Sequence, residues 1–256
     1  MKSSTSNQLK CLLTEGFAPA LLALALVSHS ATPSWAGEGN AGNSGILPPK
    51  SQPFGKSYGE WAAAFWQWAL ALPIEEHPFL ESPNDPNFDF SAGQSGKVWF
   101  WSAPDGPLTR TVSMPAGKAL FLTLRDVEVS TLEEAPFFGA TEAEQRAGSK
   151  WFADRIVNVF CVIDGVPVQN LQAYRFSTPQ FEFTAPVPWI FGATGGMGTA
   201  VGDGYFLMLA PLSKGLHTIH YGGTFHFEPG ELGEWQVDPL DLPKDITIQL
   251  TVEDGE

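Results

Sequence analysis

The segment HTIHYGGTFHFE contains three histidines and a glutamate, and two of the histidines have a spacing from the glutamate that could hold a metal ion. Side chains alternate between the two faces of a strand, so His220, His226 and Glu228 share one face if this segment is a regular strand. Two imidazoles and a carboxylate suit a transition metal, and metal-binding jelly rolls often take ligands from inward-facing strand positions. We therefore consider these residues as metal ligands or acid/base catalysts, with ordinary surface or hydrogen-bonded side chains as the alternative.

Neighbouring residues complicate this hypothesis. A bulge at Gly222 and Gly223 would break the alternation of faces. His217 falls on the opposite face from His220 if the strand is regular, so the H-x-x-H spacing loses the meaning that it can have on a helix. His77 lies in an acidic loop, and only the fold could bring it close to the late histidines.

A second candidate site has the D-x-N-x-D spacing that lets alternate side-chain oxygens converge on Ca²⁺. Its residues are Asp85, Asn87 and Asp89. An EF-hand is excluded, because Phe90 replaces the required glycine and Gly96 replaces the bidentate glutamate. The alternative is a solvated loop in which Asp and Asn side chains hydrogen-bond to the nearby backbone.

Patterns for covalent or acid/base catalysis are weaker. Asp126 and Glu128 share a strand face, which is compatible with the paired carboxylates of a glycosidase, although an acidic chain produces such pairs by chance.

Three other motifs are not expected to do chemistry. The segment 93–97 (GQSGK) lacks the last glycine of G-x-S-x-G and leads into a strand, so no nucleophile elbow is expected. The glycine-rich stretch 192–204 lacks a dinucleotide fingerprint and is expected to be a connecting loop, or a loop over a pocket. Cys161 lies in an apolar run and is expected to be a buried, unreactive thiol.

Tryptophan is abundant, with 9 residues in the chain, and exposed tryptophans on a β-sandwich can stack against the faces of sugars. The candidate ligand-binding tryptophans are Trp66, Trp99, Trp101, Trp189 and Trp235. The alternative is that these rings fill the core, which is the commoner position of such pairs as Trp99 and Trp101.

Two amphipathic helices are expected beside these candidates. Ser57 and Glu60 have the spacing of a capping box, and apolar residues follow at helical intervals until Pro73. Thr141 and Glu144 repeat the capping box before a second helix.

The rest of the ordered chain alternates short strands with turns. The predicted strands span residues 97–102, 109–114, 119–129, 157–163, 174–184, 204–210, 216–227 and 245–252. This pattern, without a regular βαβ alternation, predicts an all-β fold with two accessory helices, arranged as an antiparallel β-sandwich or jelly roll.

The N-terminus has the features of a secretory signal peptide. Lys2 and Lys10 precede the apolar run 17–27, which leads to small residues at Ser34 and Ala36. We expect residues 1–36 to be a signal peptide, 37–53 a flexible linker and 54–256 a single β-sandwich domain in the periplasm or outside the cell. The apolar run is too short to span a bilayer, and no transmembrane segment is expected after it.

Four segments of the chain resemble parts of a group of secreted bacterial proteins that have no assigned activity. They are YGEWAAAFWQWAL, GQSGKVWF, MPAGKALF and LSKGLHTIHYGGTF. The resemblance implies export and a β-rich fold, and it implies no activity and no site residues.

Net charge and composition restrict the partners. The formal net charge is −14, and no cluster of Lys and Arg offers a surface for phosphates, so a nucleic acid partner is not expected. The leading hypothesis is a secreted protein that binds an extracellular small molecule or glycan, or an envelope component, without catalysis. The alternatives are a secreted hydrolase or metal-dependent enzyme that uses the late histidines, and a structural or assembly module.

Overall fold

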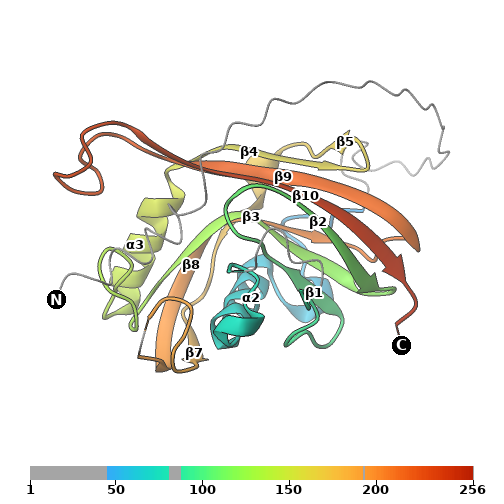
Figure 1. Ribbon diagram of the computed structural model, residues 1–256, viewed down its shortest axis with the longest axis horizontal. Helices are drawn as coiled ribbons and strands as arrows, with labels where there is room; N and C mark the ends of the chain where they lie inside the picture. The colour runs from blue at the N-terminus through green and yellow to red at the C-terminus, as the bar shows by residue number, and fades with distance from the viewer. Residues whose placement is uncertain (1–44, 81–87, 193, 256) are drawn as a thin grey trace.

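A computed structural model describes residues 45–80, 88–192 and 194–255 of the chain (Figure 1). Within these residues the protein is mostly β with two α-helices, so the predicted all-β fold with accessory helices is confirmed. The predicted signal peptide and residues 37–44 of the predicted linker lie outside the described residues, as do Asp85 and Asn87.

Ten strands form two five-stranded sheets in the described residues. In the first sheet, β1 (Val98–Trp101), β3 (Ala119–Ser130) and β8 (Gly196–Leu209) lie side by side, and both β6 (Arg175–Ser177) and β7 (Phe181–Ala185) pair with β8. The second sheet has the order β2 (Gly106–Pro115), β10 (Leu240–Glu253), β9 (Gly215–Phe227), β4 (Ile156–Ile163) and β5 (Val166–Pro167).

Both sheets are mixed, which corrects the expectation of antiparallel sheets. β1 pairs with β3 in parallel, and β2 pairs with β10 in parallel, whereas the other pairs are antiparallel. The β1–β3 pair is parallel because β2, which lies between them in sequence, belongs to the other sheet. The chain therefore crosses from one sheet to the other after β1 and returns for β3, instead of forming a hairpin. The arrangement of the two sheets as a sandwich or jelly roll stays a prediction.

Both predicted helices form and begin at the predicted capping boxes. Helix α2 (Tyr58–Ala71) has its capping box between Ser57 and Glu60, and α3 (Glu142–Ala153) has one between Thr141 and Glu144. Short 3₁₀ helices occupy Pro53–Gly55, Ile74–Glu76 and Leu171–Tyr174. In the described part of the chain, no helix is long and apolar enough to cross a membrane.

The described domain begins before Phe54, the predicted domain start. Ile46 is buried and forms a β-bridge with Leu209, at the end of β8. The Leu47 amide donates to the Met208 carbonyl at 2.8 Å. Part of the segment expected to be a flexible linker therefore packs on the first sheet.

Two strand predictions are wrong in their limits. The expected strand 174–184 is divided into β6 and β7, with residues 178–180 between them. The glycine-rich stretch 192–204, expected to be a loop, is mostly strand, because β8 starts at Gly196.

Glycines in β8 make room for bulky side chains of neighbouring elements. A Cβ atom at Gly202 would lie 2.9 Å from Nε1 of Trp66 on α2, and one at Gly204 would lie 2.4 Å from Cβ of Asp126 on β3. Because glycine has no Cβ atom, β8 can pass close to Trp66 and Asp126. A larger residue at either position would push these side chains away.

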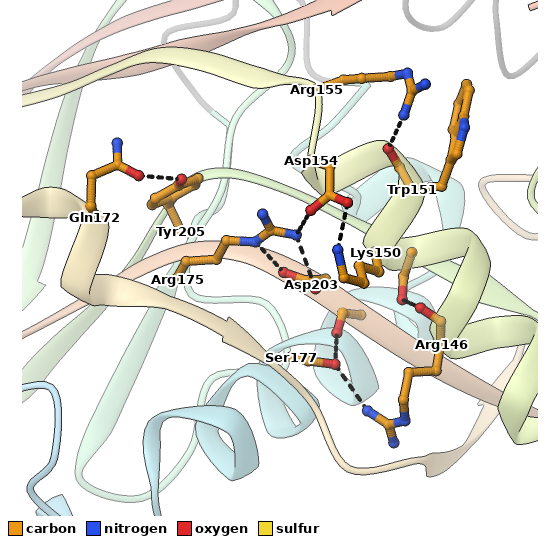
Figure 2. A network of polar contacts seen from close by, with 12 residues as sticks. Arg146, Lys150, Trp151, Asp154, Arg155, Gln172, Arg175, Ser177, Asp203 and Tyr205 are labelled. Carbon is orange, nitrogen blue, oxygen red and sulfur yellow. Dashed lines mark hydrogen bonds and ion pairs between the residues drawn. The ribbon is translucent and has the colours of Figure 1, made fainter. Parts of the chain in front are cut away.

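Polar contacts hold α3 against the first sheet (Figure 2). The Arg175 guanidinium on β6 contacts Asp203 on β8 at 2.9 Å and Asp154, at the end of α3, at 2.8 Å. Lys150 contacts the same Asp154 carboxylate at 2.6 Å. This network fixes the end of the helix that carries Phe152, a buried ring.

The two sheets contact each other through a buried polar pair. Nε1 of Trp101 on β1 donates to the Tyr221 hydroxyl on β9 at 2.7 Å.

The bulge expected at Gly222 and Gly223 lies in the neighbouring strand instead. At these glycines the pairing of β9 with β10 is regular. The pairing of β9 with β4 is irregular, and the extra residue belongs to β4, between Val157 and Phe160. The expected bulge therefore falls in the partner strand.

The adjacent glycines of β9 give a test of this packing. A Cβ atom at Gly222 would lie 1.8 Å from the Lys244 carbonyl oxygen, whereas one at Gly223 would meet its nearest atoms at 3.4 Å. We expect Gly222→Ala to lower the free energy of unfolding by about 2 kcal/mol or more, because β9 and β10 must separate. Urea denaturation measures the change, and Gly223→Ala is the matched control, with an expected loss below about 1 kcal/mol. Equal losses in the two variants would contradict this account.

Candidate functional site

A cavity of about 130 Å³ lies between the two sheets, and most of its wall is apolar. Its apolar wall includes Trp66, Phe79, Phe152, Phe225, Phe227 and Leu242. These side chains come from α2, the segment after the second 3₁₀ helix, α3, β9 and β10. The cavity therefore forms only when both helices and both sheets have assembled.

Charged side chains occupy the other part of the wall. They are Asp105, Arg125, Asp126, Glu128, Glu133 and Lys244. Asp105 precedes β2, three of the others follow one another on β3, Glu133 follows β3, and Lys244 belongs to β10 of the opposite sheet. Burying so many charges is costly unless they are paired or neutralised, which is why such groups often mark functional sites.

Arg125 is 3 % exposed and contacts three different parts of the chain. Its guanidinium forms an ion pair with Asp105. It also donates to the Leu242 carbonyl at 3.1 Å and lies 4.3 Å from the centre of the Phe225 ring. Arg125 is therefore held in place by an anion, a carbonyl and a ring face.

Lys244 is 6 % exposed and forms no direct ion pair within the described part of the chain. Burial lowers the pKa of its ammonium group, and the nearby Asp105 and Asp126 carboxylates oppose this change. The Lys244 side chain is thus buried beside the cavity, where the Asp105 and Asp126 carboxylates favour its charged form.

The two carboxyl groups on β3 have raised pKa values. Burial raises the pKa of Asp126 to about 6, against the opposing charges of Lys244 and Arg125. Burial also raises the pKa of Glu128 to about 7, although a hydrogen bond with Glu133 opposes the shift. At neutral pH the Glu128 and Glu133 pair therefore holds a proton for part of the time.

Several polar atoms on the cavity wall have no hydrogen-bond partner among the described residues. They are Nε1 of Trp66, Nε of Arg125, Oδ2 of Asp105, Oδ2 of Asp126 and Oε1 of Glu128. A buried polar atom without a partner costs about 1–3 kcal/mol, and more when it is charged. A molecule in the cavity that offers hydrogen bonds would recover part of this cost.

The structure does not bring the late histidine cluster together. His226 lies between Asp241 at 2.7 Å and Glu228 at 3.3 Å, whereas His220 contacts Asp245 at 2.7 Å. Both histidines face the same side of β9, but six residues along a strand span about 20 Å. Within the described ranges, no three His, Cys, Asp or Glu side chains are placed to hold a metal ion. The hydrogen bonds with Asp241 and Glu228 raise the pKa of His226.

His217 has partners that resemble those of a catalytic histidine. Its Nδ1 lies 2.7 Å from the Asp164 carboxylate, and its Nε2 lies 3.3 Å from the Ser213 hydroxyl. However, Nε2 is closer to the Ser213 carbonyl oxygen, at 2.9 Å, and a carbonyl can only accept. Although partial burial lowers the pKa of His217, these hydrogen bonds raise it overall. Both ring nitrogens are therefore occupied by hydrogen bonds that link the turn at Asp164 to the loop at Ser213, and neither is free to act as a base.

His77 and Asp89 have structural surroundings. His77 is fully buried, its Nδ1 accepts from the Phe79 amide at 3.2 Å, and burial lowers its pKa to about 3. Asp89 accepts from the amide and hydroxyl of Ser91 at 2.8 and 2.6 Å. This is the local turn that we considered as the alternative to a Ca²⁺ site.

The candidate tryptophans lie in three environments. Trp99, Trp101 and Trp189 are buried in the core, so they offer no face to a ligand at the surface. Trp66 is buried and lines the cavity. Trp235, in the connection between β9 and β10, is 58 % exposed.

The thiol of Cys161 is buried, as predicted.

Sequence reasoning identified Asp126 and Glu128 as a pair on one strand face but missed Arg125, Glu133 and Lys244. A signal was present in the segment ALFLTLRDVEVS, where charged residues interrupt an otherwise apolar strand. A charge in such a run indicates a buried charge, which requires a partner.

Comparisons with known proteins found no similar protein: no family model, no curated protein and no solved structure matches the chain.

The raised pKa of Glu128 predicts how stability depends on pH. The native state keeps a proton at Glu128 between the ordinary pKa of 4.5 and the native value of about 7, so stability should fall as the pH rises through this range. The loss is roughly 1.4 kcal/mol for each unit by which the pKa is raised. We expect Glu128→Gln to flatten this decline in urea denaturation at pH 4.5–7.5. Glu182→Gln, a substitution at an exposed position on β7, is the control, and its stability should fall with pH as in the unmodified protein. If the stability of Glu128→Gln falls equally with pH, the raised pKa of Glu128 is contradicted.

Proposed function

We propose that the protein is exported and binds a small, largely apolar molecule in the cavity between its sheets. The observation that carries this proposal is the combination of an aromatic wall with buried polar atoms that lack partners. Ligand sites typically have this composition: mostly apolar surface with a few polar groups that orient the ligand.

The size of the cavity limits the ligand. Its volume of about 130 Å³ is close to the ~150 Å³ of an engineered apolar cavity that accepts benzene. Pockets for drug-sized molecules are larger, at roughly 300–1,000 Å³. A ligand with one ring, or with a short branched chain, therefore suits the cavity.

A glycan-stacking surface has less support. Of the five candidate tryptophans, only Trp235 is exposed. One exposed ring gives a weak platform for an extended sugar chain, because such binding depends on several stacked faces.

The export part of the proposal rests on the sequence alone. The basic residues, the apolar run 17–27 and the small residues before position 37 have the order of a signal peptide. Mass measurement of the protein purified from the periplasm or medium tests it: a mature chain that starts near Gly37 is expected, and an intact Met1 would contradict it.

Binding of toluene tests the cavity. NMR titration should show a dissociation constant of about 1 mM or tighter, which corresponds to about −4.1 kcal/mol. Ala103, a buried residue on the cavity wall, offers a blocking variant. We expect Ala103→Leu to weaken toluene binding at least about fivefold, because its side chain takes the ligand's volume. Leu250→Ala, in the core but outside the cavity wall, controls for lower stability and should bind toluene normally; equal binding by all three proteins would contradict the location.

A second candidate function is acid/base hydrolysis in the same cavity. The specific observation is that two buried carboxyl groups, those of Asp126 and Glu128, lie two residues apart on β3, line the cavity and have raised pKa values. A carboxyl group with a raised pKa can donate a proton near neutral pH, as the acid of such a pair must, while an ionised carboxylate serves as the base.

Hydrolysis of p-nitrophenyl glycosides tests this second candidate. We expect the rate to fall at least about 100-fold in both Asp126→Asn and Glu128→Gln. A rate equal to that of buffer, or one retained in both variants, would contradict hydrolysis and leave the binding proposal standing.

A further inference from the structure

Building on the proposed binding function, we propose that the ligand carries a hydroxyl group on a small apolar body. The hydroxyl group accepts a hydrogen bond from Nε1 of Trp66 and donates one to the Glu128 carboxyl group. The apolar body occupies the aromatic part of the cavity. This assignment rests on an unpartnered donor and an unpartnered acceptor that the fold places beside each other.

The donor, Nε1 of Trp66, is buried on the cavity wall and has no hydrogen-bond partner among the described residues. Edge-to-face contacts with Phe65 and Phe79 hold the indole ring, at 5.4 and 6.1 Å between ring centres. Nε1 lies beside β8, where a Cβ atom at Gly202 would be 2.9 Å away. However, the Gly202 amide donates to the Thr178 hydroxyl at 2.9 Å, and its carbonyl accepts from the Thr178 amide at 2.8 Å. The nearest strand backbone is thus engaged elsewhere, and the indole N–H keeps no acceptor.

The acceptor, Oε1 of Glu128, is also buried on the cavity wall without a hydrogen-bond partner in the described part of the chain. Glu128 lies directly opposite Gly202 in the β3–β8 pair. Side chains of directly opposite residues share one face of a sheet, with Cβ atoms about 4.5–5.5 Å apart. The Trp66 N–H, which lies over the Cβ position of Gly202, and the Glu128 side chain therefore lie beside each other on one face.

A hydroxyl group matches this pair of atoms. It has one O–H donor and two acceptor lone pairs, so the same group can accept from Trp66 and donate to Glu128. A carboxyl group keeps acceptor capacity in both its ionised and its protonated form. An ammonium group cannot accept and an ether oxygen cannot donate, so each would leave one of the two buried atoms unsatisfied, which is costly.

Other unpartnered atoms of the cavity wall are also of both kinds. Within the described residues they are one donor, Nε of Arg125, and two acceptors, Oδ2 of Asp105 and Oδ2 of Asp126. A ligand group that both donates and accepts is therefore suited to this wall at more than one position.

The rest of the cavity suits an apolar body of one ring. Phe79 packs against Trp66 and lines the cavity, as do the buried rings of Phe152 and Phe227. The cavity volume of about 130 Å³ leaves little room beyond one ring and one small polar group.

Isothermal titration of the purified protein at pH 7 tests the proposal with probes that have equal numbers of non-hydrogen atoms. Benzyl alcohol donates and accepts, anisole only accepts, benzylamine as an ammonium ion only donates, and ethylbenzene does neither. We expect benzyl alcohol to bind at least about fivefold more tightly than each of the other probes. A cavity without a matching polar pair would favour ethylbenzene instead, because burying an unpaired hydroxyl group is unfavourable.

A tryptophan variant tests the donor. Trp66→Phe removes Nε1 and keeps an aromatic ring on the wall, so benzyl alcohol should bind at least about fivefold more weakly while ethylbenzene binds as before or more tightly. Trp99→Phe is the matched control, because Nε1 of Trp99 is likewise buried without a partner in the described residues but lies outside the cavity wall. The control should keep the preference for benzyl alcohol. Equal losses in the two variants would contradict the role of Trp66.

The outcomes separate this inference from the proposed function. Ethylbenzene or anisole binding as tightly as benzyl alcohol would overturn the hydroxyl assignment and leave the binding function supported. Benzylamine binding most tightly would also overturn it. Absence of binding by every probe would overturn both proposals. If Trp66→Phe does not fold, the comparison of probes in the unmodified protein still decides.

Discussion

Burial of the Arg125 guanidinium between the sheets is the constraint on which the rest of the structure depends. Its ion pair with Asp105, its hydrogen bond to the Leu242 carbonyl and its contact with Phe225 join the segment before β2 to β3, β9 and β10. Removing one partner of a buried ion pair costs about 3–5 kcal/mol, because the other charge remains without a partner in a low dielectric. The same arrangement keeps the neighbouring Asp126 and Glu128 away from water, and this burial raises their pKa values.

The apolar surroundings of these charges come from elements that are far apart in the sequence. Helix α2 supplies Trp66, and α3, fixed by Arg175 and Asp203, supplies Phe152. Glycines in β8 allow Trp66 and Asp126 to lie close to that strand. Local sequence features, including two capping boxes and small residues in one strand, thus combine to form one cavity with an aromatic part and a charged part.

Local features were predictable from the sequence, whereas long-range pairings were not. The capping boxes at Ser57 and Thr141 were predicted correctly, because each depends on residues three positions apart. The parallel pairs were missed, since turn signals do not show that the chain changes sheets between strands. The glycine-rich stretch 192–204 was mistaken for a loop because its partners, Trp66 and Asp126, are more than 60 residues away. The face shared by His220 and His226 was predictable, and their separation of about 20 Å along the strand shows why they cannot share one metal ion.

The charged wall of the cavity is divided between the two sheets, with Asp126 and Glu128 on one and Lys244 on the other. A ligand bound there would contact both sheets at once and would link them reversibly. Because a ligand that binds only the folded state stabilises it by mass action, heat resistance would then follow the ligand's concentration. The loaded protein would also survive proteases longer than the empty one, because proteases cleave mainly the unfolded chain.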